Sequence, residues 1–179
     1  MVALKPPLAH VRPHSMTLDY ARASFFDASA LVRVYLDEPG SEPVRSYFNS
    51  EPTKFTTQFC FYETLNVFKS KCVYRQLISR AQYLEASFRF VAWYGMMRRT
   101  TGDLDFTEPT VFFKARDMAE RTGLDLSDAM QILSVTLGDY SSFCEGSKTV
   151  FVTADKPLAR VARAEGLRVW SVLEEAAPQ

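Results

Sequence analysis

The chain has few of the residues that mark secreted, zinc-binding or strongly charged proteins. It has three cysteines in 179 residues, and they lack Cys-x-x-Cys spacing, which argues against a disulfide framework and predicts reduced thiols in a cytoplasmic protein. The formal net charge is zero, so any polyanion must be bound by local patches of charge. No apolar run reaches the roughly 18 residues of a membrane span.

Glycine and histidine are also scarce, and their positions exclude further kinds of site. The seven glycines never pair at the spacing of a phosphate-binding loop. The two histidines, His10 and His14, lie among prolines that argue against a metal-binding helix. We expect residues 1–21 to form a flexible tail, residues 22–175 to form one domain and residues 176–179 to form a short C-terminal tail.

The pattern that organises the chain is a short apolar strand that runs into a carboxylate and then into a helix. It occurs where Phe25 and Phe26 precede Asp27, and again where residues 150–153 precede Asp155. Strands that alternate with helices predict an α/β protein, a three-layer α/β/α sandwich with a mainly parallel central sheet. Because ligands bind at the carboxyl ends of parallel strands, both aspartates should reach one edge of the sheet.

The intervening sequence predicts further elements by its periodicity and its capping residues. A polar stripe of Glu63, Asn66 and Ser70 runs along one long aromatic helix. The next helix is apolar on more than one side, which suits a buried hairpin or a subunit interface and predicts a homodimer. Ser127 is the expected N-cap of a later helix. The expected helices span residues 41–47, 58–75, 79–99, 109–121, 128–137 and 156–165, and the later strands span residues 53–57, 149–153 and 167–172.

Four carboxylates form a candidate site: Asp27, Glu63, Asp128 and Asp155. Each has an ordinary interpretation alone, as a helix cap, a dipole partner or a surface residue. Together they offer several oxygens from separate elements, which is the supply that hard divalent cations require. Zinc is disfavoured because no cysteine–histidine pair has ligand spacing. We interpret Asp125 as a loop residue rather than as a fifth ligand.

Four segments, taken in order, resemble the motifs of PIN-domain proteins and in particular the VapC-like toxins. They are Phe-Phe-Asp-Ala-Ser-Ala-Leu-Val with a following Glu-Pro-Gly-Ser, Tyr-Glu-Thr-Leu-Asn-Val, Leu-Ser-Asp-Ala-Met and Val-Thr-Ala-Asp-Lys-Pro-Leu, within about residues 23–173. The resemblance implies an endoribonuclease toxin that depends on Mg²⁺ or Mn²⁺ and has an antitoxin partner. It implies that the four carboxylates are the catalytic, metal-binding quartet, with the Ser29 and Thr153 hydroxyls beside it. Met130, Gln131 and Ile132 depart from the commoner His or small-residue pattern after the third acid.

Other residues complete the predicted site. Ser29, Asn66 and Thr153 should orient the ligands or water. Positive charge for an RNA substrate must be local, and the candidates are Lys69, Lys156 and Arg160, with Lys71 and Arg75 further along the helix of Glu63.

Other functions fit parts of the same pattern. The chain could be a catalytically idle PIN-like module that binds RNA or protein, or a DNA-directed nuclease of the same fold. A phosphate-accepting role for Asp27 is disfavoured, because one class of such enzymes needs a second aspartate at the position of Ser29. Mg²⁺-dependent cleavage of single-stranded RNA would separate a nuclease from an idle module.

Overall fold

Four parallel strands form the centre of the computed structural model, which describes residues 23–51, 53–97, 104–137 and 149–178. The strands are β1 (Ala23–Phe26), β2 (Thr53–Phe55), β3 (Thr149–Thr153) and β4 (Arg168–Ser171). Their order in the sheet is β2-β1-β3-β4, and every neighbouring pair is parallel. The expected N-terminal tail and the loop at 138–148 lie outside the described residues, as does most of the turn expected at 100–105.

The two central strands are buried on both faces, as parallel strands covered by helices must be. Phe25 of β1 stacks on Phe151 of β3 with ring centroids 4.8 Å apart, and it meets Phe55 of β2 edge-on at 5.6 Å. These rings bury a large apolar area in the middle of the sheet. The register of β1 and β3 is therefore strongly fixed, and with it the position at which each strand ends.

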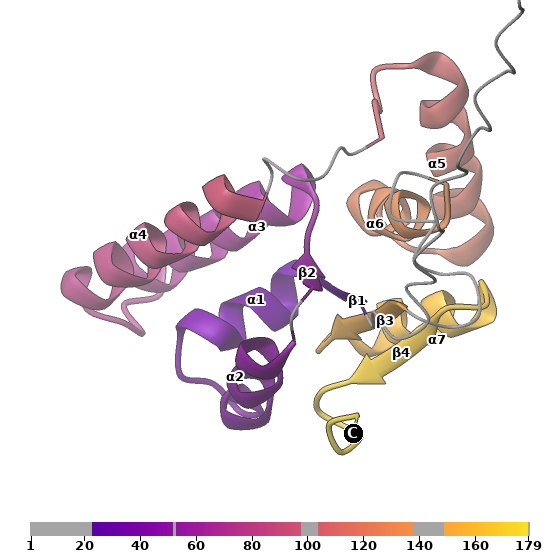
Figure 1. Ribbon diagram of the computed structural model, residues 1–179. Coiled ribbons are helices and arrows are strands. Elements are labelled where there is room, and N and C mark those ends of the chain that lie inside the picture. The colour runs from indigo at the N-terminus through magenta and orange to yellow at the C-terminus, as the bar shows by residue number, and fades with distance from the viewer. Residues whose placement is uncertain (1–22, 52, 98–103, 138–148, 179) are drawn as a thin grey trace, which may run out of the picture.

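Helices cover the sheet on both sides, which confirms the predicted α/β/α sandwich (Figure 1). One layer contains the first four helices and the other contains the last three (Figure 1). The first layer consists of α1 (Ala28–Tyr35), α2 (Ser41–Ser50), α3 (Gln58–Lys69) and α4 (Arg80–Met97). The second consists of α5 (Pro109–Thr122), α6 (Leu126–Leu137) and α7 (Lys156–Ala164).

Helices α2, α3 and α6 have ends that differ from the expectation, and α2 continues to Ser50 rather than ending at residue 47. The helix expected to continue to Arg75 changes at Lys69 into the π-helix η1 (Ser70–Tyr74), in which the Arg75 amide donates to the Ser70 carbonyl at 2.9 Å. Ser127 is not the cap of α6. The helix begins two residues earlier than expected, at Leu126, and the Asp125 carboxylate accepts from the Asp128 amide at 2.9 Å. Aspartate and serine cap almost equally well, so composition alone does not separate the two positions.

Helices α3 and α4 form an aromatic hairpin. Phe90 of α4 is fully buried and packs on Phe61 and Phe68 of α3, while Tyr94 stacks on Phe61 at 4.2 Å. The opposite side of α4 is different, because it exposes a stripe of apolar side chains. We call this stripe the α4 apolar face: Leu84, Phe88, Val91 and Met96.

The described residues hold no helix long and apolar enough to cross a membrane. Two of the three cysteines lie in the described part of the chain, and both are free thiols. Cys60 is buried beside the Thr57 hydroxyl, which also accepts from the Cys60 amide as the cap of α3.

Candidate active site at the carboxyl edge of the sheet

Asp27 is a buried carboxylate, held rigidly where β1 ends. It is 3% exposed, and it caps α1 by accepting from the Ala30 amide at 2.7 Å. The Ser29 hydroxyl reaches its carboxylate at 2.9 Å, and Thr153 donates to Oδ2 at 2.7 Å. Burial raises the pKa of Asp27 to about 6 although these hydrogen bonds oppose the shift.

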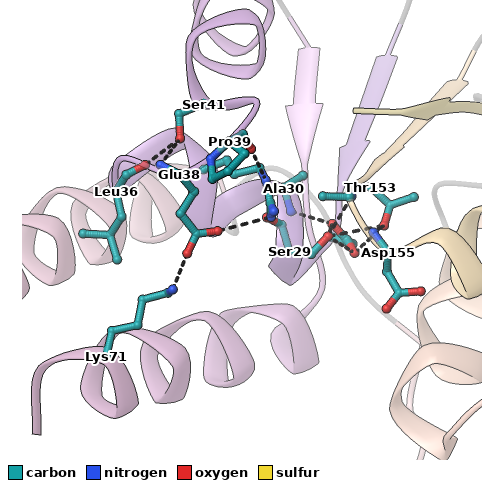
Figure 2. A network of polar contacts seen from close by, with 12 residues as sticks. Ser29, Ala30, Leu36, Glu38, Pro39, Ser41, Lys71, Thr153 and Asp155 are labelled. Carbon is teal, nitrogen blue, oxygen red and sulfur yellow. Dashed lines mark hydrogen bonds and ion pairs between the residues drawn. The ribbon is translucent and has the colours of Figure 1, made fainter. Parts of the chain in front are cut away.

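Asp155 occupies the equivalent position at the end of β3, and it caps α7 by accepting from the Leu158 amide at 2.8 Å. Two hydroxyls connect the ends of β1 and β3. The Thr153 hydroxyl that donates to Asp27 also accepts from the Asp155 amide at 2.9 Å, and the Ser29 hydroxyl accepts from the Ala154 amide at 2.8 Å (Figure 2). The predicted proximity of the two strand-end aspartates is thus built by the backbone and by two short side chains.

Glu63 and Asp128 reach the same edge from α3 and α6, and they are held more loosely. The amide nitrogen of Gln131 lies 3.5 Å from a Glu63 oxygen and 3.4 Å from an Asp128 oxygen, which are long contacts. The pKa of Asp128 is raised to about 7, mainly by loss of hydration and also by the nearby carboxylates of Asp125, Asp155, Asp27 and Glu63.

The Glu63 side chain is exposed overall, but its carboxylate interacts electrostatically with the other carboxylates of the site. Loss of hydration raises its pKa to about 7, with additional contributions from Asp27, Asp125 and Asp155. Like charges therefore act on one another across four elements of the fold. The four predicted carboxylates share one electrostatic environment at one edge of the sheet.

Gln131 and Asp125 are the site residues to which the sequence argument gave no role. Gln131 is 1% exposed, and its amide oxygen has no hydrogen-bond partner in the described part of the chain. A buried amide between two carboxylates is visible only once α3 is docked on α6. Asp125 is an exposed cap, and its charge acts on Glu63 and Asp128.

The side chains are not arranged around a cation as they stand. Among the described residues, no group of three or more histidine, cysteine, aspartate or glutamate side chains is placed to hold a metal ion. The donor set nevertheless suits a hard divalent ion, because it consists of carboxylates whose mutual repulsion a cation would relieve. Asp27 is fixed by hydrogen bonds from the Ala30 amide and from the Ser29 and Thr153 hydroxyls. Glu63 and Asp128 have to break only the long Gln131 contacts in order to turn towards an ion.

Two hollows flank Glu63. The basic hollow has a volume of about 250 Å³ and includes Arg33, Lys71 and Arg75 in its lining. The aromatic hollow has a volume of about 420 Å³ and includes Phe59 and Tyr62. Both hollows are lined by Glu63, Val67 and Ser70, so they adjoin each other.

The remaining predicted residues take different positions. Asn66 lines the aromatic hollow beside Glu63. Lys69 is exposed and lines neither hollow, and Arg160 is exposed on α7. Lys156 pairs with Glu174 at 3.0 Å. Of the cations that follow Glu63 along its helix, it is therefore Lys71 and Arg75 that adjoin the acidic site.

Fold and site together define a class of protein: an α/β/α sandwich with carboxylates gathered at the carboxyl edge of a parallel sheet. The family described as PIN domain matches residues 24–164, and the chain belongs to this family. PIN domains are generally metal-dependent nucleases, commonly act on nucleic acids and often pair with antitoxins. Comparison with curated proteins gives no match.

Proposed function

We propose that the protein is an endoribonuclease that uses Mg²⁺ or Mn²⁺ to hydrolyse RNA phosphodiester bonds. The observation that carries this proposal is the electrostatic coupling of Asp27, Glu63, Asp128 and Asp155, in which like-charged neighbours contribute to raising the pKa of Asp27, Glu63 and Asp128. Carboxylates gathered without a compensating cation are costly, so the arrangement favours a bound divalent ion. PIN family membership supports the same chemistry.

The four carboxylates would hold the ion, which when bound supplies an activated water and stabilises charge on the phosphate. The rest of the chemistry rests on this chain's own groups. Ser29 and Thr153 fix the orientation of Asp27, and the Thr153 hydroxyl also sets the position of the Asp155 backbone. Gln131 holds Glu63 and Asp128 within reach of each other.

The decisive experiment compares cleavage of matched single-stranded RNA and DNA by the wild type and by Asp27→Asn, with Mg²⁺ and with EDTA. We expect RNA cleavage that requires Mg²⁺ and is lost in the variant. Asp37→Asn is the control, because the Asp37 side chain is exposed on the surface. Preferential cleavage of DNA would identify a DNA-directed nuclease, and binding without any cleavage would identify an idle module.

We further propose that the protein is a VapC-like toxin that acts in the cytoplasm with an antitoxin partner. The four motifs and their order support this role, as does the frequent pairing of PIN domains with antitoxins. Expression of the wild type should arrest growth, and Asp27→Asn should not. Rescue by a short reading frame next to the gene would identify the antitoxin, and growth unaffected by the active nuclease would contradict the toxin role.

We also propose a homodimer, formed through the α4 apolar face. The large aromatic residues on the other sides of α4 do not belong to this face: Phe90 is buried in its own chain, and Tyr83 and Trp93 are partly buried against the core. Phe88, by contrast, is 76% exposed. Large exposed apolar patches usually mark interfaces. Sedimentation should show a dimer that Phe88→Glu dissociates, while a wild-type monomer at micromolar concentration would contradict the proposal.

A further inference from the structure

The two hollows beside Glu63 differ in chemistry, and each offers what one part of a nucleotide needs. In the basic hollow, Arg33, Lys71 and Arg75 face two carboxylates, Glu38 and Glu63. Three cations against two carboxylates leave the lining with a formal excess of one positive charge. The hollow is smaller than the roughly 300–1,000 Å³ of pockets for drug-sized molecules, and it suits a small anionic group.

The cations of the basic hollow are held in place by a polar network that ends at the acidic site. Glu38 pairs with Lys71 on one side and with Arg33 on the other, at 3.4 Å (Figure 2). Arg33 also donates to the Ser29 carbonyl at 2.8 Å, and the Ser29 hydroxyl contacts Asp27. The basic hollow and the catalytic edge are therefore one connected structure.

Arg75 differs from its two neighbours. It is exposed, and it forms no ion pair within the part of the chain that the structure describes. The π-helical turn that ends at its amide sets where its side chain starts. Such turns are rare and are frequent at functional sites. Arg75 thus places an exposed cation beside a hollow that adjoins the candidate site.

The aromatic hollow lies on the other side of Glu63 and offers a flat apolar surface. Tyr62 is 55% exposed although it is a large ring next in sequence to a candidate catalytic residue. Its hydroxyl accepts from the Gln58 amide at 3.1 Å, and its ring meets that of Phe61 edge-on, so its position is fixed. An exposed, positioned ring is the platform on which bases of single-stranded nucleic acid stack.

From these observations we propose that the two hollows form one groove for single-stranded RNA that crosses the site at Glu63. A backbone phosphate lies in the basic hollow against Arg75 and Lys71, and an unpaired base stacks on Tyr62 in the aromatic hollow. A base inside a duplex has no free face for such stacking, so the groove selects single strands. This inference rests on the proposed function for its choice of RNA.

The test is binding of a fluorescent single-stranded RNA in EDTA, measured by anisotropy over a range of salt concentrations. Arg75→Gln should weaken binding and reduce the slope of log K against log salt by about 0.7, the share of one contact to a single strand. Tyr62→Leu should weaken binding at least about fivefold because a stacked base is lost. An RNA without bases should retain the Arg75 effect and lose the Tyr62 effect, and a duplex should bind more weakly than the single strand.

The chain offers a matched control for each variant. Arg168 is exposed at the first residue of β4, at the opposite edge of the sheet, so Arg168→Gln should leave binding unchanged. Tyr74 is 72% exposed and lines neither hollow, so Tyr74→Leu should also bind like the wild type. Thermal melts of each variant show that the fold is retained.

Several results would overturn the groove. One is wild-type affinity in both Arg75→Gln and Tyr62→Leu. Another is an Arg75-dependent site that binds inorganic phosphate, or a glutamate-rich peptide, while RNA binding does not depend on Arg75. Because binding is measured without metal, its outcome is independent of cleavage. If the protein cleaves RNA but neither substitution changes RNA binding, the groove alone is refuted. If the protein cleaves no RNA but both substitutions weaken binding, the nuclease function alone is refuted.

Discussion

The two halves of the acidic site are built differently. The strand-end half contains Asp27 and Asp155, each of which caps a helix and is tied to the other strand through Thr153. The helix-borne half contains Glu63 and Asp128, whose shared contact is the Gln131 amide at 3.4 to 3.5 Å. The first half is fixed by the fold, and the second can move towards a ligand. The proposed cation would complete the site by drawing the second half towards the first. Four measurements test this difference between the halves.

The largest expected effect is that of the metal. An ion that binds the folded site and not the unfolded chain should stabilise the protein by about 2.7 kcal/mol at 100 times its dissociation constant. For a chain of this length, that raises the melting temperature by about 5–10 °C. Thermal melts with Mg²⁺ and with ionic-strength-matched KCl measure the gain. The Asp128→Asn variant should lose most of this gain in melting temperature. If Mg²⁺ does not change the wild-type melting temperature, the proposal that the site binds a metal ion is wrong.

The second effect is a pH dependence with a defined sign. The folded-state pKa values of Asp27, Glu63 and Asp128, at about 6, 7 and 7, lie above their ordinary values near 4. A raised carboxyl pKa means that the folded state holds its proton longer, so this contribution to stability is present below pH 4 and is lost between about pH 4 and 7. In EDTA, Asp128→Asn should therefore equal the wild type near pH 4 and exceed it by about 2 kcal/mol near pH 7.5.

Subtracting the stabilities of wild type and variant at each pH removes the titration of groups outside the acidic site. Asp37→Asn serves as the control, because Asp37 lies on the surface and outside the acidic site. A wild-type minus Asp128→Asn difference that stays flat from pH 4 to 7.5 would show that the helix-borne half does not carry the charge repulsion inferred here.

The third measurement concerns the strand-end half. Thr153→Val removes the hydroxyl that donates to Asp27 and accepts from the Asp155 amide, so a buried carboxylate loses one of its partners. We expect a loss of about 1–2 kcal/mol. Thr136→Val is the matched control, because the Thr136 hydroxyl bonds to carbonyls of its own helix within the described residues. Equal melting temperatures for the two variants would show that Thr153 does not hold this half together.

The smallest effect should come from Gln131. Gln131→Met keeps the side-chain volume but removes the amide between Glu63 and Asp128, so Mg²⁺ affinity should fall several-fold. The metal-free stability should change by no more than about 1 kcal/mol, because the amide oxygen already lacks a partner among the described residues. Calorimetric titration with Mg²⁺ measures the affinity, and Gln131→His should restore part of it through its ring N–H. Unchanged affinity in Gln131→Met would limit this residue to packing.

The strand-end half could be predicted from the sequence, and the helix-borne half only in part. Asp27 and Asp155 directly follow apolar strands, and the chemistry of parallel sheets places such residues at one edge. Glu63 was recognisable from its polar stripe with Asn66 and Ser70, which in the structure line one hollow. The position of Gln131 depends on how α3 docks on α6, and no local pattern specifies that contact. The π-helical turn could not be predicted either, because the apolar pattern of residues 58–75 continues through it.

The order of the strands has a consequence for how the protein is made. The hydrogen bond between Thr153 and Asp27 joins residues 126 positions apart, and β1 lies in the sheet between β2 and β3. A nascent chain that has not yet released residues 149–155 from the ribosome can pair β1 on one side only and lacks Asp155. Such a chain exposes an unpaired strand edge, which is prone to aggregate. It also has no assembled acidic site, so the proposed nuclease activity would arise only after residues 149–155 have left the ribosome.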